Sequence, residues 1–295
     1  MFRDAIEEVS KFTRPIHSIS RTYNQTDVVP GTATLFFVNK DGWAVTCKHV
    51  LNQIIAVQKL NKNYTAFKKE IDSISTSNKN KKEERKKIEQ KYGYNDKSTV
   101  QLKNNFRNCV DNLTGFKCHA HKTRDLALIK FQGFKNLLIK HFPTFGNADD
   151  LKQGDYLCRL GYPFPEFNNY KYNLAKDDIE WTKKGKSGSP KFPIEGMVTR
   201  FIGKPRNIYG IELSRPGLKG QSGGPLFNKR GEVVGMQAST KHLHLGFDIE
   251  EKEIRSNGES KKVSDYSFLH LGVCMHGSVI KKFMEKHDIS FETVE

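Results

Sequence analysis

Residues 220–225 read Gly-Gln-Ser-Gly-Gly-Pro, and this stretch decides more about the chain than any other short segment. A serine hydroxyl attacks poorly at neutral pH unless a neighbouring imidazole takes its proton. The flanking glycines permit a tight turn, in which the amide groups of Gly220 and Ser222 can point together at a developing oxyanion. The stretch therefore predicts that Ser222 is a nucleophile with an oxyanion hole beside it.

A histidine and an aspartate precede this serine along the chain. His49 lies in the run Val-Thr-Cys-Lys-His-Val at residues 45–50, and Asp125 opens the run Asp-Leu-Ala-Leu-Ile at residues 125–129. Taken alone, such a histidine is usually structural, and such an aspartate usually caps a strand or a turn. In the order histidine, aspartate, serine, however, the residues predict an acyl-transfer triad. His49 is then the general base, and Asp125 orients and stabilises its ring.

With these residues in place, the chain resembles the trypsin-like, chymotrypsin-fold serine peptidases, and among them the bacterial, DegP-like branch. The resemblance runs from roughly residue 28 to 288 and includes four further segments in family order, at residues 31–38, 161–163, 196–200 and 231–236. It implies an all-β fold of two six-stranded antiparallel β-barrels. It also implies that the strand following the serine pairs with the substrate backbone through Gln237, Ala238, Ser239 and Thr240.

The chain departs from the digestive members of this family at two positions near the serine. Gln221 stands where those members carry an aspartate that pairs with a new amino terminus after zymogen cleavage, so that activation route is not expected. Pro216 lies six residues before the serine, where specificity for lysine or arginine would require an acidic group. Cleavage after basic residues is therefore not supported.

A long insertion separates the histidine from the aspartate. Apolar residues recur there at alternating steps of three and four, which places them on one stripe of a helix from about residue 53 to 75. These residues are Val57, Leu60, Tyr64, Phe67, Ile71 and Ile74. Helical composition resumes at residues 81–92 after a run of turn formers. The pattern predicts a helical hairpin, over about residues 53–95, that is inserted in the first barrel with its stripe packed inward.

These features define the expected domain boundaries. An N-terminal extension is expected at residues 1–27, the first barrel with its insertion at 28–145, and the second barrel with a C-terminal helix at 146–295. Two further insertions are expected, one at 164–193 that overhangs the cleft and one at 248–265. The latter contains Asn257-Gly258, a strong hairpin signal. No PDZ domain is expected after the C-terminal helix.

The composition bears on partners and on location. The formal net charge is +16, yet the densest lysine run also contains glutamates, so it reads either as a solvated helix face or as a docking surface for a partner protein or nucleic acid. A nucleic-acid role is not favoured, since no recognisable binding motif accompanies the charge. Five cysteines without regular spacing, no signal peptide and no apolar run of membrane-spanning length predict a cytoplasmic protein that does not enter membranes.

Two groups of histidine and cysteine residues contain side chains that can bind metals. In the first group, His119 and His121 alternate along the chain and lie next to Cys118. In the second group, His242 and His244 alternate in the same way. Neither group has the two tight pairs that complete zinc sites usually show. No metal and no cofactor are therefore predicted.

The sequence thus predicts a cytoplasmic serine endopeptidase that cleaves protein or peptide substrates through an acyl-enzyme at Ser222. The resemblance further suggests regulated cleavage, as by an effector in a bacterial stress or defence pathway, with a regulatory protein partner left open. The alternative is a protease-fold binding module without catalytic activity that uses its basic surface.

Overall fold

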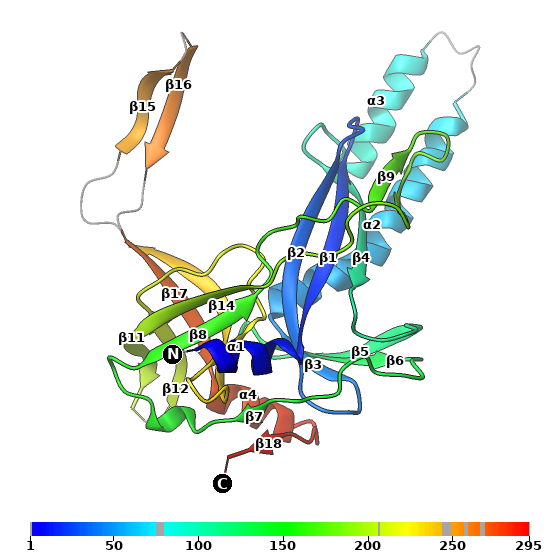
Figure 1. Cartoon of the computed structure of the whole chain (residues 1–295). Coiled ribbons are helices and arrows are strands. Elements are labelled where there is room, and N and C mark those ends of the chain that lie inside the picture. Colours follow the sequence, from blue (N-terminus) through cyan, green and yellow to red (C-terminus); the bar gives the residue numbers. More distant parts are fainter. Residues whose placement is uncertain are drawn as a thin grey trace.

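A computed structural model describes residues 2–74, 80–205, 207–243, 249–256, 259–265 and 269–294 of the chain (Figure 1). The fold is mostly β-structure, and its strands form two large sheets that face each other across a shared core. Within the described residues, no helix is long and apolar enough to cross a lipid bilayer.

The first sheet has six antiparallel strands in the order β4-β1-β2-β3-β6-β5 and forms a half-barrel. Its strands are β1 (Thr13–Thr22), β2 (Val28–Phe37), β3 (Trp43–Thr46), β4 (Thr99–Phe106), β5 (Gly115–Ala120) and β6 (Ala127–Gln132). The expected N-terminal extension at 1–27 is wrong for its second half, because β1 pairs with both β2 and β4. Polar residues on the inward face of β1, His17 and Arg21, hide the apolar alternation that marks a half-buried strand.

The second sheet closes into a six-stranded antiparallel barrel, because β13 pairs with both β8 and β14. Its strands are β8 (Tyr156–Gly161), β11 (Phe192–Lys204), β12 (Asn207–Leu213), β13 (Pro225–Phe227), β14 (Val233–Leu243) and β17 (Leu269–His276). Two short strands, β7 (Thr144–Phe145) and β18 (Glu292–Thr293), extend the sheet in parallel beyond β14. The expected two-unit chymotrypsin-type architecture is confirmed, with one closed barrel and one half-barrel.

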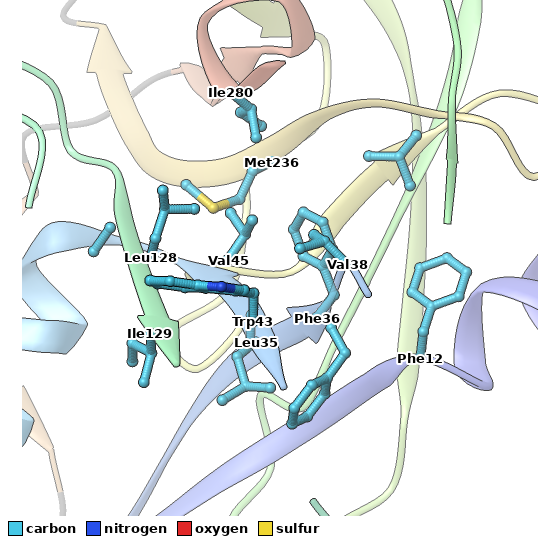
Figure 2. Packing of buried hydrophobic residues seen from close by; sticks show 14 of the residues in the cluster. Phe12, Leu35, Phe36, Val38, Trp43, Val45, Leu128, Ile129, Met236 and Ile280 are labelled. Atoms are coloured by element: carbon cyan, nitrogen blue, oxygen red, sulfur yellow. The ribbon is translucent and has the colours of Figure 1, made fainter. Parts of the chain in front are cut away.

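One hydrophobic core joins the two units. Figure 2 shows Met236, from the closed barrel, and Ile280 next to Val45 and Leu128 of the half-barrel. All four side chains are almost fully buried. Since burial of each such side chain stabilises the fold by about 1.5–3 kcal/mol, the two units are held as one body. Loops from both units can therefore meet in a fixed geometry.

The insertion between the histidine and the aspartate is the predicted helical hairpin, formed by α2 (Lys48–Asp72) and α3 (Lys81–Tyr92). Tyr64 and Phe67 of α2 are buried against Tyr23 and Val100 of the half-barrel, as the apolar stripe predicts. Helix α2 begins about five residues earlier than expected, because it follows β3 directly after the extended residue Cys47. Its first turn therefore carries His49.

The insertion at residues 164–193, which was expected to overhang the cleft, packs on the half-barrel. It forms a hairpin of β9 (Tyr170–Asn173) and β10 (Asp178–Trp181). Phe167 and Ile179 are buried there against Ile19 of β1, and Arg21 Nη2 lies 2.7 Å from Asp177 Oδ1. Scattered aromatic residues, which give no sustained period in the sequence, provide this contact.

The remaining elements are a helix near the C-terminal end of the described chain and four short segments. They are α1 (Arg3–Ser10), the 3-10 turn η1 (Ala148–Asp150), α4 (Gly277–Glu285), β15 (Ile249–Ser256) and β16 (Glu259–Asp265). The predicted C-terminal helix is confirmed by α4, and the predicted hairpin by the antiparallel pair β15–β16, which projects from the barrel in Figure 1. The residues Asn257-Gly258, on which that hairpin was predicted, lie outside the described residues.

Candidate active site

His49 and Asp125 are in direct contact, although 76 positions separate them in the chain. The Asp125 carboxylate accepts a hydrogen bond from the His49 amide at 2.9 Å and lies 2.7 Å from His49 Nδ1. Because a carboxylate can only accept, Nδ1 carries the proton and Nε2 is left as the basic nitrogen of the neutral ring. The pair therefore has the tautomer and the orientation that a general base requires.

The charge of Asp125 is set by two opposing effects. Burial alone would raise the pKa of this carboxyl group, but the hydrogen bonds from the His49 ring and amide outweigh burial and lower its pKa. Asp125 is consequently ionised at neutral pH, and it can stabilise a positive charge on the imidazole.

The turn that carries Ser222 depends on glycines at positive φ. Gly220 has φ +97° and Gly223 has φ +88°, a region that L-residues with a side chain rarely adopt. A Cβ at Gly223 would also lie 2.1 Å from the Thr34 carbonyl oxygen. The Gly223 amide donates to the Gln237 carbonyl at 2.9 Å, and the Gly224 amide to the Gln221 carbonyl at the same distance. The backbone around the nucleophile is thus fixed on both sides.

Thr34 on β2 connects the serine turn to the end of β3, the strand that precedes His49. Its amide donates to the Ser222 carbonyl at 3.0 Å, and its hydroxyl donates to the Gly220 carbonyl at 2.8 Å. The Thr34 carbonyl accepts from the Thr46 hydroxyl at 2.8 Å, three residues before His49. Nothing in the local sequence singles out Thr34, because its role arises from the packing of β2 between two distant segments.

A second connection runs through the Gln237 carbonyl. This oxygen accepts from the Gly223 amide and also from the Cys47 thiol, whose Sγ lies 3.3 Å away. One acceptor therefore holds the residue after Ser222 and the residue two before His49. The structure in this way brings together the neighbourhoods of all three predicted catalytic residues.

The amides of Gly220 and Ser222, the predicted oxyanion donors, have no acceptor among the described residues. Within the described part of the chain, neither the Gly220 nor the Ser222 amide donates to another backbone carbonyl or to a side chain. Two amides without an acceptor, two residues apart in a tight turn, can stabilise a developing negative charge.

Gln221 occupies the position of the digestive enzymes' aspartate, and its side chain is buried. Its Nε2 donates to the Phe192 carbonyl at 2.9 Å, and its Oε1 accepts from the Leu218 amide at 3.0 Å. The loop before the nucleophile is thereby tied to β11 through a neutral side chain. This arrangement needs no ion pair with a new amino terminus.

A pocket of about 400 Å³ opens beside Ser222. Of the predicted substrate-binding residues, Gln237, Ser239 and Thr240 line it, while Ala238 is buried in the core. The other lining residues are Pro216, Gly217, Leu218, Lys219, His242 and His270. A side chain that precedes a scissile bond at Ser222 can enter this pocket.

Two residues near the pocket are not among the site residues that the sequence predicts. Arg159 is fully buried in β8 and donates to the Gln237 side chain, where Nη1 lies 2.9 Å from Oε1. A charged residue inside the apolar run Tyr-Leu-Cys-Arg-Leu-Gly could have signalled it. His270 reaches the pocket because the β14–β17 register places it opposite His242, a pairing that no local signal reveals.

Three of the described side chains lie as close together as the ligands of a metal ion would. Cys47, His49 and Asp125 each offer a ligand atom within 4.8 Å of the others. Burial, however, raises the pKa of the Cys47 thiol well above its ordinary value, which disfavours the thiolate that a metal requires. His119 stacks on His287, and His121 Nδ1 accepts the amides of residues 123 and 124, so this pair does not converge on one point. His244 lies outside the described residues.

Comparison with known proteins agrees with this geometry. No curated protein matches the chain at a significant level. The family model of the trypsin-like peptidase domain matches residues 31–236, a span that contains His49, Asp125 and Ser222. The chain therefore belongs to the trypsin-like peptidase family.

Proposed function

We propose that the chain is a serine endopeptidase that cleaves protein substrates through an acyl-enzyme at Ser222. The observation that carries this proposal is the His49–Asp125 pair, 2.7 Å apart, together with a serine turn that Thr34 connects to Thr46, three residues before His49. Family membership agrees with a protease, since the matching region includes all three residues.

The proposed reaction has two steps. Ser222 Oγ attacks the substrate carbonyl carbon while His49 Nε2 takes the hydroxyl proton, and the amides of Gly220 and Ser222 stabilise the oxyanion. The C–N bond then breaks, and the His49 proton passes to the leaving amine. Water then attacks the acyl-enzyme while His49 takes a proton from it, and His49 returns this proton to Ser222 Oγ as the acid product leaves. Asp125 stabilises the imidazolium in both steps.

We further propose a reducing compartment, the cytoplasm, as the place of action. All five cysteines are free thiols, and burial raises the pKa of Cys109 and Cys274, among others, which protects them from oxidation. The action of a regulatory partner in a bacterial stress or defence pathway belongs to the same proposal, and it rests on the family resemblance alone.

Incubation of the purified chain with unfolded protein substrates tests the peptidase. We expect new amino termini in the products, mapped by mass spectrometry, for the unaltered chain. Ser222→Ala and His49→Ala should each reduce the cleavage rate by roughly 10⁴-fold or more, because the triad acts as a unit. Cleavage that persists in Ser222→Ala would remove the acyl-enzyme from the proposal.

A binding module with a basic contact surface is the second candidate, and the exposed lysines of α3 favour it. Lys81, Lys82, Lys86 and Lys87 all point to solvent. Replacing these four with glutamine should leave folding unchanged, since surface substitutions shift stability by about 0.5 kcal/mol or less each. If the basic surface recruits the partner, the variant should bind or cleave that partner more weakly at low salt. An unchanged rate with an unchanged salt dependence would remove this role.

A further inference from the structure

The pocket beside Ser222 is lined by hydrogen-bond donors and by basic groups. Among its described lining residues none carries a carboxylate, while Lys219, His242 and His270 are all present. Thr240, also in the lining, already donates its hydroxyl to the Gly217 carbonyl at 2.8 Å. The described lining therefore offers no carboxylate to pair with a cationic substrate side chain.

A buried cation lies directly behind the pocket wall. Arg159 Nη2 donates to the carbonyls of Arg215 and Pro216 at 2.6 and 2.7 Å, and Nη1 donates to Gln237 Oε1. No carboxylate pairs with this guanidinium among the described residues, and its Nε has no acceptor there. An uncompensated buried charge is costly, and its field is weakly screened by solvent.

The chain makes room for this cation with a glycine. A Cβ at Gly272 of β17 would lie 2.1 Å from Arg159 Nη1 and 2.5 Å from the Arg215 carbonyl oxygen. Because Gly272 has no side chain, the guanidinium can occupy this space inside the barrel. Pro216 and Gln237 both accept hydrogen bonds from Arg159 and both line the pocket. The guanidinium therefore lies close enough for its positive potential to extend into the pocket.

The two histidines form a pair at the pocket. Their Nδ1 atoms lie 2.6 Å apart, so one ring donates its Nδ1 proton and the other accepts. In the neutral pair the accepting ring holds its own proton on Nε2. This ring consequently provides an N–H donor beside the pocket.

We propose that this pocket binds an acidic side chain, so that the peptidase cleaves after aspartate or glutamate. The His242–His270 pair donates its Nε2–H group to the substrate carboxylate, and Arg159 contributes the field that favours the charge of this carboxylate. This inference rests on the proposed peptidase function for cleavage, but the preference of the pocket can be measured without it.

Two measurements on the full chain separate the two ideas. The first maps cleavage sites of the unaltered chain in a proteome-derived peptide library by mass spectrometry. The second measures binding to the Ser222→Ala variant of peptide pools that end in glutamate, glutamine or lysine and are randomised elsewhere. Every peptide in these pools has the same terminal carboxylate, so differences in binding report on the last side chain alone.

We expect acidic residues to dominate before the cleaved bond, and glutamate to be favoured over glutamine by about tenfold or more in binding. The double variant His242→Gln with His270→Gln should lose most of this preference. The matched variant His141→Gln, at an exposed site away from the pocket, should retain it.

Each other outcome contradicts the proposal at a definite point. Cleavage after neutral or basic residues overturns the acidic pocket while leaving the peptidase intact. Absence of cleavage with a retained glutamate preference in Ser222→Ala overturns the peptidase while leaving the pocket. Equal binding of all three pools, weak or strong, overturns the acidic pocket. A full glutamate preference in the double histidine variant overturns the role given to the histidines.

Discussion

The Asp125 carboxylate holds one residue by two hydrogen bonds, to the amide and to the ring of His49. This geometry fixes the ring relative to its own backbone, so that rotation about the side-chain bonds of His49 would break a charge-assisted bond. Since the burial of the pair is only partial, the orientation comes mainly from this contact and not from packing.

Replacement of this carboxylate by an amide should therefore affect the reaction more than the fold. Asp125→Asn keeps the shape but can fix the wrong tautomer of His49, and we expect kcat/KM to fall by roughly 10⁴-fold. Circular dichroism should be unchanged. Asp41→Asn, at an exposed aspartate that takes no part in the His49–Asp125 contact, is the matched control and should retain full activity. Equal activity of the two variants would show that Asp125 does not orient the base.

A second prediction concerns the glycine that follows the nucleophile. In Gly223→Ala the new methyl group meets the Thr34 carbonyl oxygen and the Thr46 hydroxyl at 2.1 and 2.3 Å, so the serine turn must shift. A displacement of about 1 Å can cost about a hundredfold in rate, and we expect kcat/KM to fall by that order.

Gly154→Ala is the control for this glycine. Gly154 also has positive φ, at +95°, but nothing lies within 4 Å of its added Cβ. Both variants suffer backbone strain, whereas only Gly223→Ala disturbs the site. A similar loss of activity in both would assign the effect to general strain instead of to the position of Ser222.

At the scale of elements, the helical hairpin is attached to the half-barrel by an aromatic cluster. Phe67 of α2 has its ring centroid 5.4 Å from that of Tyr23 and 4.9 Å from that of Tyr94, and only 3% of its surface is exposed. His49 lies on the same helix. The cluster thus supports the helix that carries the base, more than four turns away along α2.

Truncation of this anchor should destabilise the fold. We expect Phe67→Ala to lower the free energy of unfolding by about 3–5 kcal/mol, as is usual when a buried aromatic side chain is removed. Ile55→Ala on the exposed face of the same helix should change it by about 0.5 kcal/mol or less. Urea titration measures both variants. Equal stabilities would show that the hairpin unfolds independently of the core.

Some of these elements follow from local patterns, and others depend on distant contacts. Helix α2 is predictable because Tyr64 and Phe67 continue a helical stripe, whereas β1 is not, because His17 and Arg21 face inward with polar partners. The histidine, aspartate and serine can be identified from their motifs. Arg159 and His270 cannot be placed in the same way, since the β14–β17 register brings His270 opposite His242, and Arg159 of β8 reaches Gln237 only in the folded barrel.

At the scale of the molecule, His17 connects the half-barrel to the insertion at 164–193. Its ring stacks on Phe167 with centroids 4.1 Å apart, and its Nε2 lies 3.0 Å from Ser189 Oγ. Burial, with a smaller contribution from the positive charge of Arg107, lowers the pKa of His17 to about 4. The native protein therefore keeps this ring neutral under conditions in which the unfolded chain protonates it.

This depressed pKa predicts a loss of stability in acid. Between the unfolded pKa of 6.5 and the native value of about 4, the unfolded state binds more protons, so stability falls as the pH falls through that window. The loss attributable to His17 amounts to at most about 3 kcal/mol below pH 4. His17→Phe should show a smaller decrease between pH 7 and 4.5 in denaturant titrations. An identical pH dependence in both proteins would assign the acid sensitivity to other groups.

Covalent labelling of Ser222 by a fluorophosphonate tests the central claim most directly, since the probe reacts only with a serine activated by a base and an oxyanion site. Intact-mass and peptide-level mass spectrometry should place one adduct on Ser222 of the unaltered chain. Labelling should vanish in Ser222→Ala and become much slower in His49→Ala. A correctly folded chain that remains unlabelled, or an adduct at another residue, would contradict an acyl-transfer site at Ser222.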